Sequence, residues 1–353
     1  MENKSNEVKR KFGLDIARFL AIFLVIMVHS MLHDGFYHTS IEGGKMFFLL
    51  FLRNTGFLCV PLFLLLTGYL NTNAGITKKY YSKIKKLVLA YLLISIIVII
   101  FKYFYFNNHD IVGMIIGITN YSTIDYAWYF EMYVGLFLLI PFLNILYKNI
   151  SSKKEKQWLI ITMLLVTSVG DILSSLKIEE YRIAIMPNYW NIVFPITYYF
   201  IGAYLNEYKI KINKYINFIA LVFVLFIQTF MMFYYCHGYT FVDKISIGYN
   251  NLFTIIESTL LFLLVYNIDN TVKIISPLIS KISKVSFNMY LLSIIFDFVV
   301  YREVTKHFTG INSLFIVPLI SVPIVFSLSF ISAIFVDFLV RLLTKKNNIA
   351  NMN

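Results

Sequence analysis

Charged side chains are scarce in this sequence. Only 14% of the 353 residues are Asp, Glu, Lys or Arg, whereas 59% are hydrophobic and 18% are aromatic. A water-soluble domain carries roughly a quarter charged residues. The polar side chains are therefore too few to cover a soluble body of this size, and the composition indicates an integral membrane protein whose main solvent is lipid.

Cysteine is almost absent as well. The two cysteines, Cys59 and Cys236, lie in separate apolar runs. One isolated pair provides neither a disulfide framework nor a metal-ligand spacing. The sequence therefore predicts two packing residues, with no bound metal and no bound cofactor.

The chain also lacks internal repeats, low-complexity tracts and linkers rich in Pro, Gly or Ser. One integral domain is therefore expected to fill it. The first apolar run is about twenty residues long and has no small-residue cleavage site after it, so we expect a retained helix rather than a signal peptide. The expected organisation is a cytoplasmic segment at 1–12, a membrane domain at 13–343 and a cytoplasmic tail at 344–353.

Long apolar runs are what the sequence has in abundance. Read against the polar breaks, they predict an all-α, polytopic membrane protein with about ten transmembrane helices. The expected spans are 13–33, 46–70, 87–106, 127–147, 158–173, 189–205, 215–235, 251–266, 285–301 and 314–340.

Basic residues are distributed unevenly between the connecting segments. With the N-terminus inside, the outside segments hold few of the 31 Lys and Arg residues, namely Lys45, Lys177, Arg182, Lys244, Arg302 and Lys306. Such a bias follows the positive-inside rule, so we expect both termini in the cytoplasm and the protein in the plasma or inner membrane. The rule also accounts for the net charge of +12 without nucleic acid as a partner.

The first span carries ionisable residues where they are costly. A charged side chain in the bilayer core costs at least about 2.5 kcal/mol on insertion scales, so each one is a functional candidate. Asp15 and Arg18 are neighbours on one helix face and are expected to pair. His29 follows Arg18 by about three turns and about 16 Å of rise. These three residues therefore form one polar stripe, which His33 extends by a further turn.

Two more charged residues fall at comparable depths in other spans. Arg53 lies about two turns below the outer end of the second span, and Glu131 lies one to two turns into the fourth. We expect them to pair inside the bundle, as a structural ion pair or as part of a binding site. Asp297, in the outer half of the ninth span, is a third polar position.

The segment 78–86, between the second and third spans, is strongly basic. As a topology signal it needs no further role. Its Lys83, Lys85 and Lys86 also bring three ammonium groups within about one turn, which suits a phosphorylated ligand. Both interpretations remain open.

Four stretches, in this order, resemble the bacterial acyltransferase 3 family, the membrane O-acyltransferases that modify surface polysaccharides. They are LDIAR (14–18) with His29, RNTG (53–56) with VPLFLLLTGYL (60–70), WYFEMYVGLFLLIP (128–141) and SFNMYLLS (286–293). Ser293 stands where many members have His, Tyr126 or Ala127 where many have His before the Trp, and lysines replace the usual cytoplasmic arginine pair. No esterase-like domain follows the tenth span, so the chain is similar to the stand-alone membrane-domain type.

The resemblance implies transfer of an acyl group, usually acetyl, from cytoplasmic acyl-CoA to a hydroxyl of a polysaccharide or lipid-linked glycan. His29 would be the general base or a transient acyl carrier. Arg18 would bind the donor, with Asp15 orienting it. The remaining expected roles are CoA-phosphate binding by Lys83, Lys85 and Lys86, and acceptor binding by Arg53, Glu131 and Trp128.

Two other classes remain open from the sequence. Polar stripes inside a helical bundle also serve a transporter or flippase that moves a glycan or small metabolite. A polysaccharide polymerase is polytopic too, but the longest expected external loop is roughly twenty residues, too short for a folded external domain.

Overall fold

Helices make up nearly all of the computed structural model, which describes residues 11–170, 177–178, 181–182, 188–241, 248–269 and 274–350. Most of the expected segment 1–12 lies outside the described residues. Many helices are rich in Val, Ile and Phe, which have modest helix propensity in water. In lipid, however, an α-helix forms hydrogen bonds for every backbone N–H and C=O group within its own segment. This requirement outweighs the intrinsic helix propensity of the residues.

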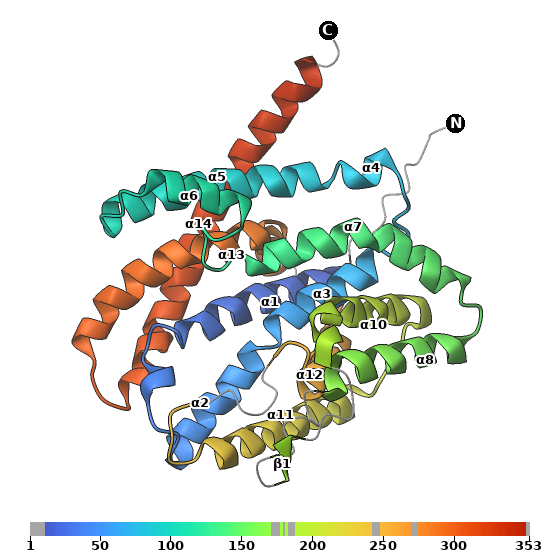
Figure 1. Cartoon of the computed structure of the whole chain (residues 1–353), viewed down its shortest axis with the longest axis horizontal. Helices are drawn as coiled ribbons and strands as arrows, with labels where there is room; N and C mark the ends of the chain where they lie inside the picture. The colour runs from blue at the N-terminus through green and yellow to red at the C-terminus, as the bar shows by residue number, and fades with distance from the viewer. Residues whose placement is uncertain are drawn as a thin grey trace.

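Figure 1 shows the arrangement of the helices around α1 and α3. The first half of the chain contains α1 (Phe12–Ser30), η1 (Phe36–His38), α2 (Gly43–Gly56), α3 (Cys59–Leu70), α4 (Lys78–Tyr81), α5 (Ile84–Tyr105), α6 (Ile111–Thr119), α7 (Trp128–Asn149), α8 (Lys153–Leu164) and the π-helical η2 (Leu165–Val169). The second half contains β1 (Lys177–Ile178), β2 (Tyr181–Arg182), η3 (Asn188–Val193), α10 (Phe194–Tyr208), α11 (Lys214–Cys236), α12 (Leu252–Val265), α13 (Ser276–Val304), η4 (Thr305–His307) and α14 (Ser313–Ala350). The two short strands pair antiparallel.

Seven helical segments in the described part of the chain are long and apolar enough to cross a membrane, and one of them, Gly43–Leu70, comprises α2 and α3 together. They coincide with seven of the ten expected spans. The other three expected spans correspond to α8 with η2, to α10 and to α12, each of which is shorter than 18 residues. A helix of 15 residues is only about 22 Å long, less than the roughly 30 Å hydrocarbon core. The all-α membrane fold is confirmed, and the count of ten is not.

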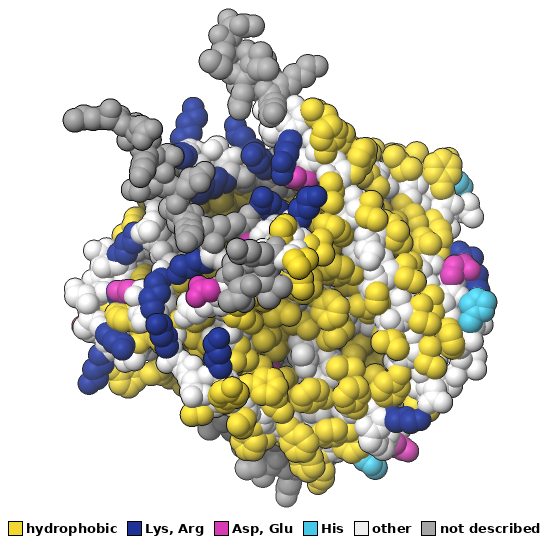
Figure 2. Space-filling view, turned by 180° about the vertical axis from the view of Figure 1, so that it is seen from behind, with side chains coloured by type: hydrophobic (Ala, Val, Ile, Leu, Met, Phe, Trp, Pro, Cys, Tyr) yellow, Lys and Arg dark blue, Asp and Glu magenta, His cyan; other side chains and the backbone are white. Residues whose placement is uncertain are grey.

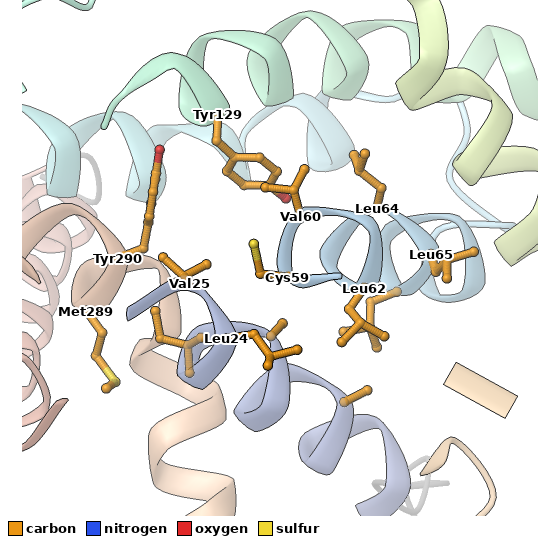
Figure 3. Packing of buried hydrophobic residues seen from close by; sticks show 14 of the residues in the cluster. Leu24, Val25, Cys59, Val60, Leu62, Leu64, Leu65, Tyr129, Met289 and Tyr290 are labelled. Carbon is orange, nitrogen blue, oxygen red and sulfur yellow. The ribbon is translucent and has the colours of Figure 1, made fainter. Parts of the chain in front are cut away.

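The centre of the bundle is formed where α1 packs against α3 and α13. Leu24 and Val25 of α1 meet Val60 of α3 and Tyr290 of α13, and Tyr129 of α7 closes the same cluster (Figure 3). All five side chains are buried. α1 is therefore the axis of the fold, with its polar stripe held at a fixed position among three other helices.

Helices α3 and α10 approach each other closely through glycine. A Cβ on Gly68 would collide with the backbone carbonyl of Tyr199, and one on Gly202 would collide with the carbonyl of Leu65. Small residues at such crossings let two backbones come within van der Waals contact in lipid. The short helix α10 is thereby fixed to α3, next to the stripe of α1.

The surface is divided between an apolar belt and a basic end. Figure 2 shows hydrophobic side chains over the middle of the molecule and Lys and Arg gathered mainly at one end. α5, α11 and α14 expose large apolar side chains that suit contact with lipid, among them Ile100, Phe104, Phe223, Leu319 and Phe335. The gathering of basic residues at one end is the arrangement that the positive-inside rule requires.

Candidate functional site

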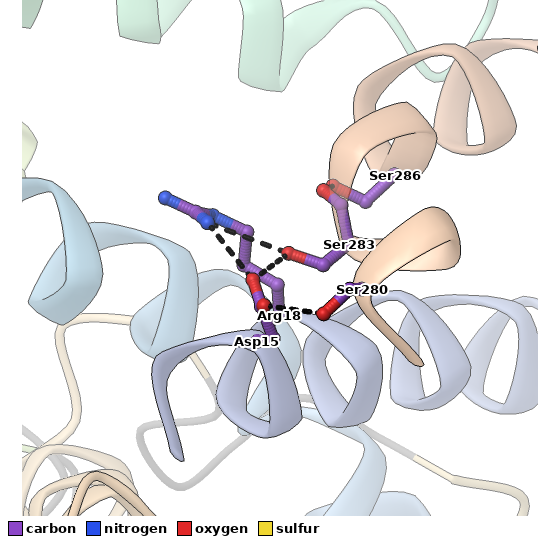
Figure 4. Close-up of polar contacts among 5 residues, drawn as sticks. All are labelled: Asp15, Arg18, Ser280, Ser283 and Ser286. Carbon is purple, nitrogen blue, oxygen red and sulfur yellow. Dashed lines mark hydrogen bonds and ion pairs between the residues drawn. The ribbon is translucent and has the colours of Figure 1, made fainter. Parts of the chain in front are cut away.

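Asp15 is fixed by serines of α13. Its carboxylate is 1% exposed and accepts hydrogen bonds from Ser280 Oγ at 2.8 Å and from Ser283 Oγ at 2.7 Å (Figure 4). Arg18 Nη1 lies 3.7 Å from Asp15 Oδ1 and donates to Ser283 Oγ at 3.4 Å. The predicted Asp15–Arg18 pair is confirmed. Because two serines donate hydrogen bonds to the Asp15 carboxylate, its position is fixed, and its ion pair with Arg18 orients the guanidinium.

Arg18 lines two cavities at once. The first, which we call the polar cavity, has a volume of about 350 Å³, and its lining includes Lys11, Asp15, Arg18, Asn73, Asn206 and Lys209. Tyr69 is also in this lining, and its hydroxyl accepts hydrogen bonds from Lys11 Nζ at 3.1 Å and Lys209 Nζ at 3.3 Å. In the described part of the chain, neither ammonium has a carboxylate within ion-pair distance. The polar cavity therefore carries excess positive charge.

The second cavity, the apolar cavity, has a volume of about 190 Å³ and begins on the other side of Arg18. Its lining includes Val25, Val60, Phe63, Leu66, Tyr133 and Phe287. Val25 is one helical turn, about 6 Å of rise, from His29. The two cavities and His29 therefore follow one another along the same side of α1.

His29 lies in the last turn of α1, beyond the apolar cavity. Its ring faces that of Tyr126, with centroids 3.8 Å apart and planes at 31°. Its Nδ1 is buried and has no hydrogen-bond partner among the described atoms. An imidazole with an uncommitted nitrogen is suited to taking a proton from, or bonding covalently to, a substrate.

A chain of hydrogen bonds surrounds His29 on its outer side. Tyr126 donates its hydroxyl proton to Asp297 Oδ2 at 3.0 Å, and His33 Nε2 lies 3.1 Å from the same phenol oxygen. Asp297 is 0% exposed and comes from α13. The His33 ring also stacks on Tyr301, with centroids 5.4 Å apart.

Arg53, a predicted acceptor-binding residue, is 3% exposed and enclosed by aromatic rings. Its guanidinium carbon lies 4.1 Å from the ring centre of Phe57 and 4.3 Å from that of Phe241, and its Nε donates to Tyr37 Oη at 3.1 Å. Cation–π contacts of this kind stabilise a guanidinium away from water.

Trp128 is connected to Arg53 through stacked rings. Its indole stacks on Tyr249 with centroids 5.3 Å apart, and Tyr249 stacks on Phe57 at 5.2 Å. Trp128 is 39% exposed, and Glu131 is exposed too. Among the described ion pairs, none joins Arg53 to Glu131. The expected Arg53–Glu131 pair is therefore not formed, because α2 and α7 turn these side chains into different surroundings.

Lys83, Lys85 and Lys86 are exposed at the start of α5. Lys83 Nζ lies 5.6 Å from the ring centre of Tyr80. None of the three lines either cavity. The ammonium groups that line the polar cavity together with Arg18 come from Lys11 and Lys209, which are far apart in sequence.

The sequence indicates no catalytic or binding role for four residues that the fold brings near the stripe: Lys11, Lys209, Tyr126 and Ser283. In the sequence, Tyr126 is one of the aromatic residues at the ends of the expected spans, and nothing there indicates that it contacts His29. Asp297 carried a signal, a carboxylate inside an apolar run, but nothing local indicates that it meets Tyr126. Within the described ranges, no group of three His, Cys, Asp or Glu side chains is placed to hold a metal ion.

The chain matches a known protein family. Residues 11–338, nearly the whole chain, match the acyltransferase 3 family model, described as an acyltransferase domain. No curated protein and no solved structure matches the chain. The matched region contains α1, both cavities and the hydrogen-bonded cluster around His29.

Proposed function

The chain belongs to the acyltransferase 3 family, and from this premise we propose that it is a membrane O-acyltransferase of the plasma or inner membrane. It transfers an acyl group, acetyl in the simplest case, from cytoplasmic acyl-CoA to a hydroxyl of a cell-surface or lipid-linked polysaccharide. The observation that carries the proposal is that Arg18 lies between a basic polar cavity and an apolar cavity that ends one turn from His29.

The polar cavity suits the phosphates of CoA. Lys11, Lys209 and Arg18 supply three cationic groups, and the one carboxylate in the lining, Asp15, is already bound to Ser280 and Ser283. A phosphate placed there would meet positive charge without a competing free carboxylate. Lys83, Lys85 and Lys86 remain candidates for donor attraction at longer range, where salt screens their effect.

The apolar cavity suits the pantetheine arm and the acyl group. Val25, Val60 and Phe63 provide apolar walls, whereas Thr67 and Asn71 offer polar groups for the amides of the arm. A donor bound with its phosphates beyond Arg18 would direct its thioester along α1 toward His29. The protein's contribution at this stage is alignment of the thioester with the imidazole.

The chemistry then needs only a base and an acceptor. His29 removes the proton from the sugar hydroxyl while that oxygen bonds to the thioester carbonyl carbon. The C–S bond breaks, and the proton passes from the imidazolium to the CoA thiolate. In the alternative route, an imidazole nitrogen of His29 first bonds to the thioester carbonyl carbon, and the C–S bond breaks to release the CoA thiolate. The sugar hydroxyl oxygen then bonds to the acyl carbon, the N–C bond to His29 breaks, and the hydroxyl proton passes to the CoA thiolate.

Binding of the acceptor sugar is supported by the row of stacked side chains formed by Arg53, Phe57, Tyr249 and Trp128. Trp128 presents part of its indole at the end of the stack, and sugar rings pack against such aromatic faces through their C–H surface. Glu131, exposed three residues further along α7, offers an acceptor for sugar hydroxyls. Arg53 supports the stack from its buried end.

The decisive experiment is transfer of label from [¹⁴C]acetyl-CoA to a panel of polysaccharide and lipid-linked glycan preparations by the purified chain in nanodiscs. His29→Ala should lose at least about 100-fold in rate, the usual minimum for a general base. His109→Ala is the matched control, because His109 is exposed and lies outside both cavities. Rapid quenching without glycan tests for label on His29 and separates the two routes.

A transporter or flippase makes a different prediction. It has no reason to bind CoA, so absence of both acetyl-CoA binding and label transfer would refute the proposed function. Normal transfer by a well-folded His29→Ala variant would keep the reaction and remove His29 from it.

A further inference from the structure

Tyr126 contacts His29 and has no role in the proposed function. It precedes α7, is 8% exposed and faces the His29 ring with centroids 3.8 Å apart. A phenol ring at this distance leaves the imidazole little freedom to rotate, since interiors are close-packed. The position of Tyr126 therefore determines the orientation of the His29 ring.

Two other elements hold Tyr126 itself. Its hydroxyl donates to Asp297 Oδ2 of α13 at 3.0 Å. Because that donation uses its only proton, the phenol oxygen can serve His33 Nε2, 3.1 Å away, only as an acceptor. His33 must then carry its proton on Nε2. The turn after α1, the segment before α7 and α13 thus converge on one hydroxyl group.

We propose that Tyr126 is a positioning residue for His29, oriented by the hydrogen bonds that it makes with Asp297 and His33. The inference rests on the proposed function, in which His29 performs the chemistry. The ring limits the imidazole to one rotamer. When His29 takes up a proton, the electron-rich face of a phenol bonded to the Asp297 carboxylate also stabilises the imidazolium.

Substitutions at Tyr126 separate the contribution of its aromatic face from that of its hydroxyl group. Tyr126→Leu removes the aromatic face, and kcat for acetyl transfer should fall about ten-fold or more, whereas KM for acetyl-CoA should not change because Tyr126 lines neither cavity. Tyr126→Phe keeps the face but loses the hydroxyl, so its kcat should fall less. Asp297→Asn keeps an acceptor for the hydroxyl but removes the negative charge that helps to stabilise the imidazolium, so it should lower kcat without changing KM.

The matched control is Tyr147→Phe. Tyr147 is a buried tyrosine at the other end of α7, and it lines neither cavity. It should retain normal kcat and KM. Elution from gel filtration and the melting temperature identify any variant that has lost its fold, and Asp297→Asn serves if Tyr126→Leu is such a variant.

A spectroscopic measurement tests the contact independently of activity. In protein labelled with ¹³C,¹⁵N-histidine, the His29 ring signals should carry a ring-current shift that Tyr126→Phe retains and Tyr126→Leu loses. The ¹⁵N shifts of His33 should report a proton on Nε2. His29→Gln and His33→Gln assign the signals.

The outcomes separate the inference from the proposed function. If the wild-type chain transfers no acyl group, the proposed function fails, while the His29 signals still decide whether Tyr126 positions the ring. If transfer depends on His29 but kcat is unchanged in Tyr126→Leu and Asp297→Asn, the positioning role is wrong and the function stands. Identical His29 signals in wild type and Tyr126→Leu would also overturn it.

Discussion

Ser283 Oγ donates a hydrogen bond to Asp15 Oδ1 at 2.7 Å, and this contact joins α1 to α13 across 268 positions of sequence. Ser283 also accepts from Arg18, so one hydroxyl links the buried carboxylate to the guanidinium that faces both cavities. The pair at the base of the stripe is thus a property of two helices rather than of α1 alone.

Removing the Asp15 carboxylate should therefore destabilise the fold. Asp15→Ala removes the carboxylate to which Ser280 and Ser283 donate, and we expect a loss of about 1–3 kcal/mol in the free energy of unfolding. Asp125→Ala is the control, because Asp125 is exposed and its ion pair with Lys102 is on the surface. Thermal unfolding in detergent should show a clearly larger change for Asp15→Ala, and equal changes would contradict the argument.

Donor binding should depend more on the cavity lysines than on the exposed ones. Lys11→Gln with Lys209→Gln removes two ammonium groups from the polar cavity, so KM for acetyl-CoA should rise about ten-fold or more. Replacing Lys83, Lys85 and Lys86 by Gln should have a smaller effect that disappears at high salt, since exposed charges are screened. A larger effect from the exposed triple variant would place the CoA phosphates at the start of α5 instead.

Arg53 and Glu131 should behave independently. Because they do not form an ion pair, the effects of Arg53→Met and Glu131→Leu on unfolding should add to within about 0.5 kcal/mol in the double variant. The same variants can be assayed with glycan acceptors, where Glu131→Leu should raise the acceptor KM and leave the acetyl-CoA KM unchanged. A double variant whose stability departs from the sum of the two single changes by clearly more than about 0.5 kcal/mol would reveal a coupling that the structure lacks.

Packing of α3 on α10 should not tolerate a methyl group. Gly68→Ala and Gly202→Ala each force a Cβ into a facing backbone carbonyl, and overpacking of this kind costs about 1–3 kcal/mol. Gly135→Ala is the matched control, because a Cβ there meets nothing within 4 Å. Melting temperatures should fall for the first two variants only, and an unchanged value for Gly68→Ala would mean that the helices are further apart.

The expected orientation can be tested with single cysteines in a background lacking Cys59 and Cys236. A cysteine at Ser82, in the basic segment before α5, should react with a membrane-impermeant maleimide only after permeabilisation. A cysteine at Asn120, in the expected external segment 107–126, should react in intact cells. Both positions are exposed, so the reagent can reach them on whichever side they lie. The reverse pattern would invert the topology.

The sequence alone was sufficient to predict that lipid is the main solvent of the protein, that the fold is all-α and that the chain belongs to the acyltransferase 3 family. Scarce charge and long apolar runs require lipid, and lipid requires helices because every backbone group must be paired. The Asp15–Arg18 contact was also predictable, since residues three apart in a helix are neighbours whatever surrounds them. Each of these conclusions depends on composition or on spacing within one helix.

The tertiary structure decided which side chains meet across helices. It brings Lys11 and Lys209 together on Tyr69, sets Tyr126 against His29 and bonds it to Asp297, and keeps Arg53 apart from Glu131. Two residues at matching depth in different spans need not meet, because the sequence gives only their position along each helix. Whether they face each other depends on how each helix is rotated about its axis and on the angle at which the helices cross. Both are set by packing contacts such as that of Gly68 with Tyr199, which involve residues far apart in the chain.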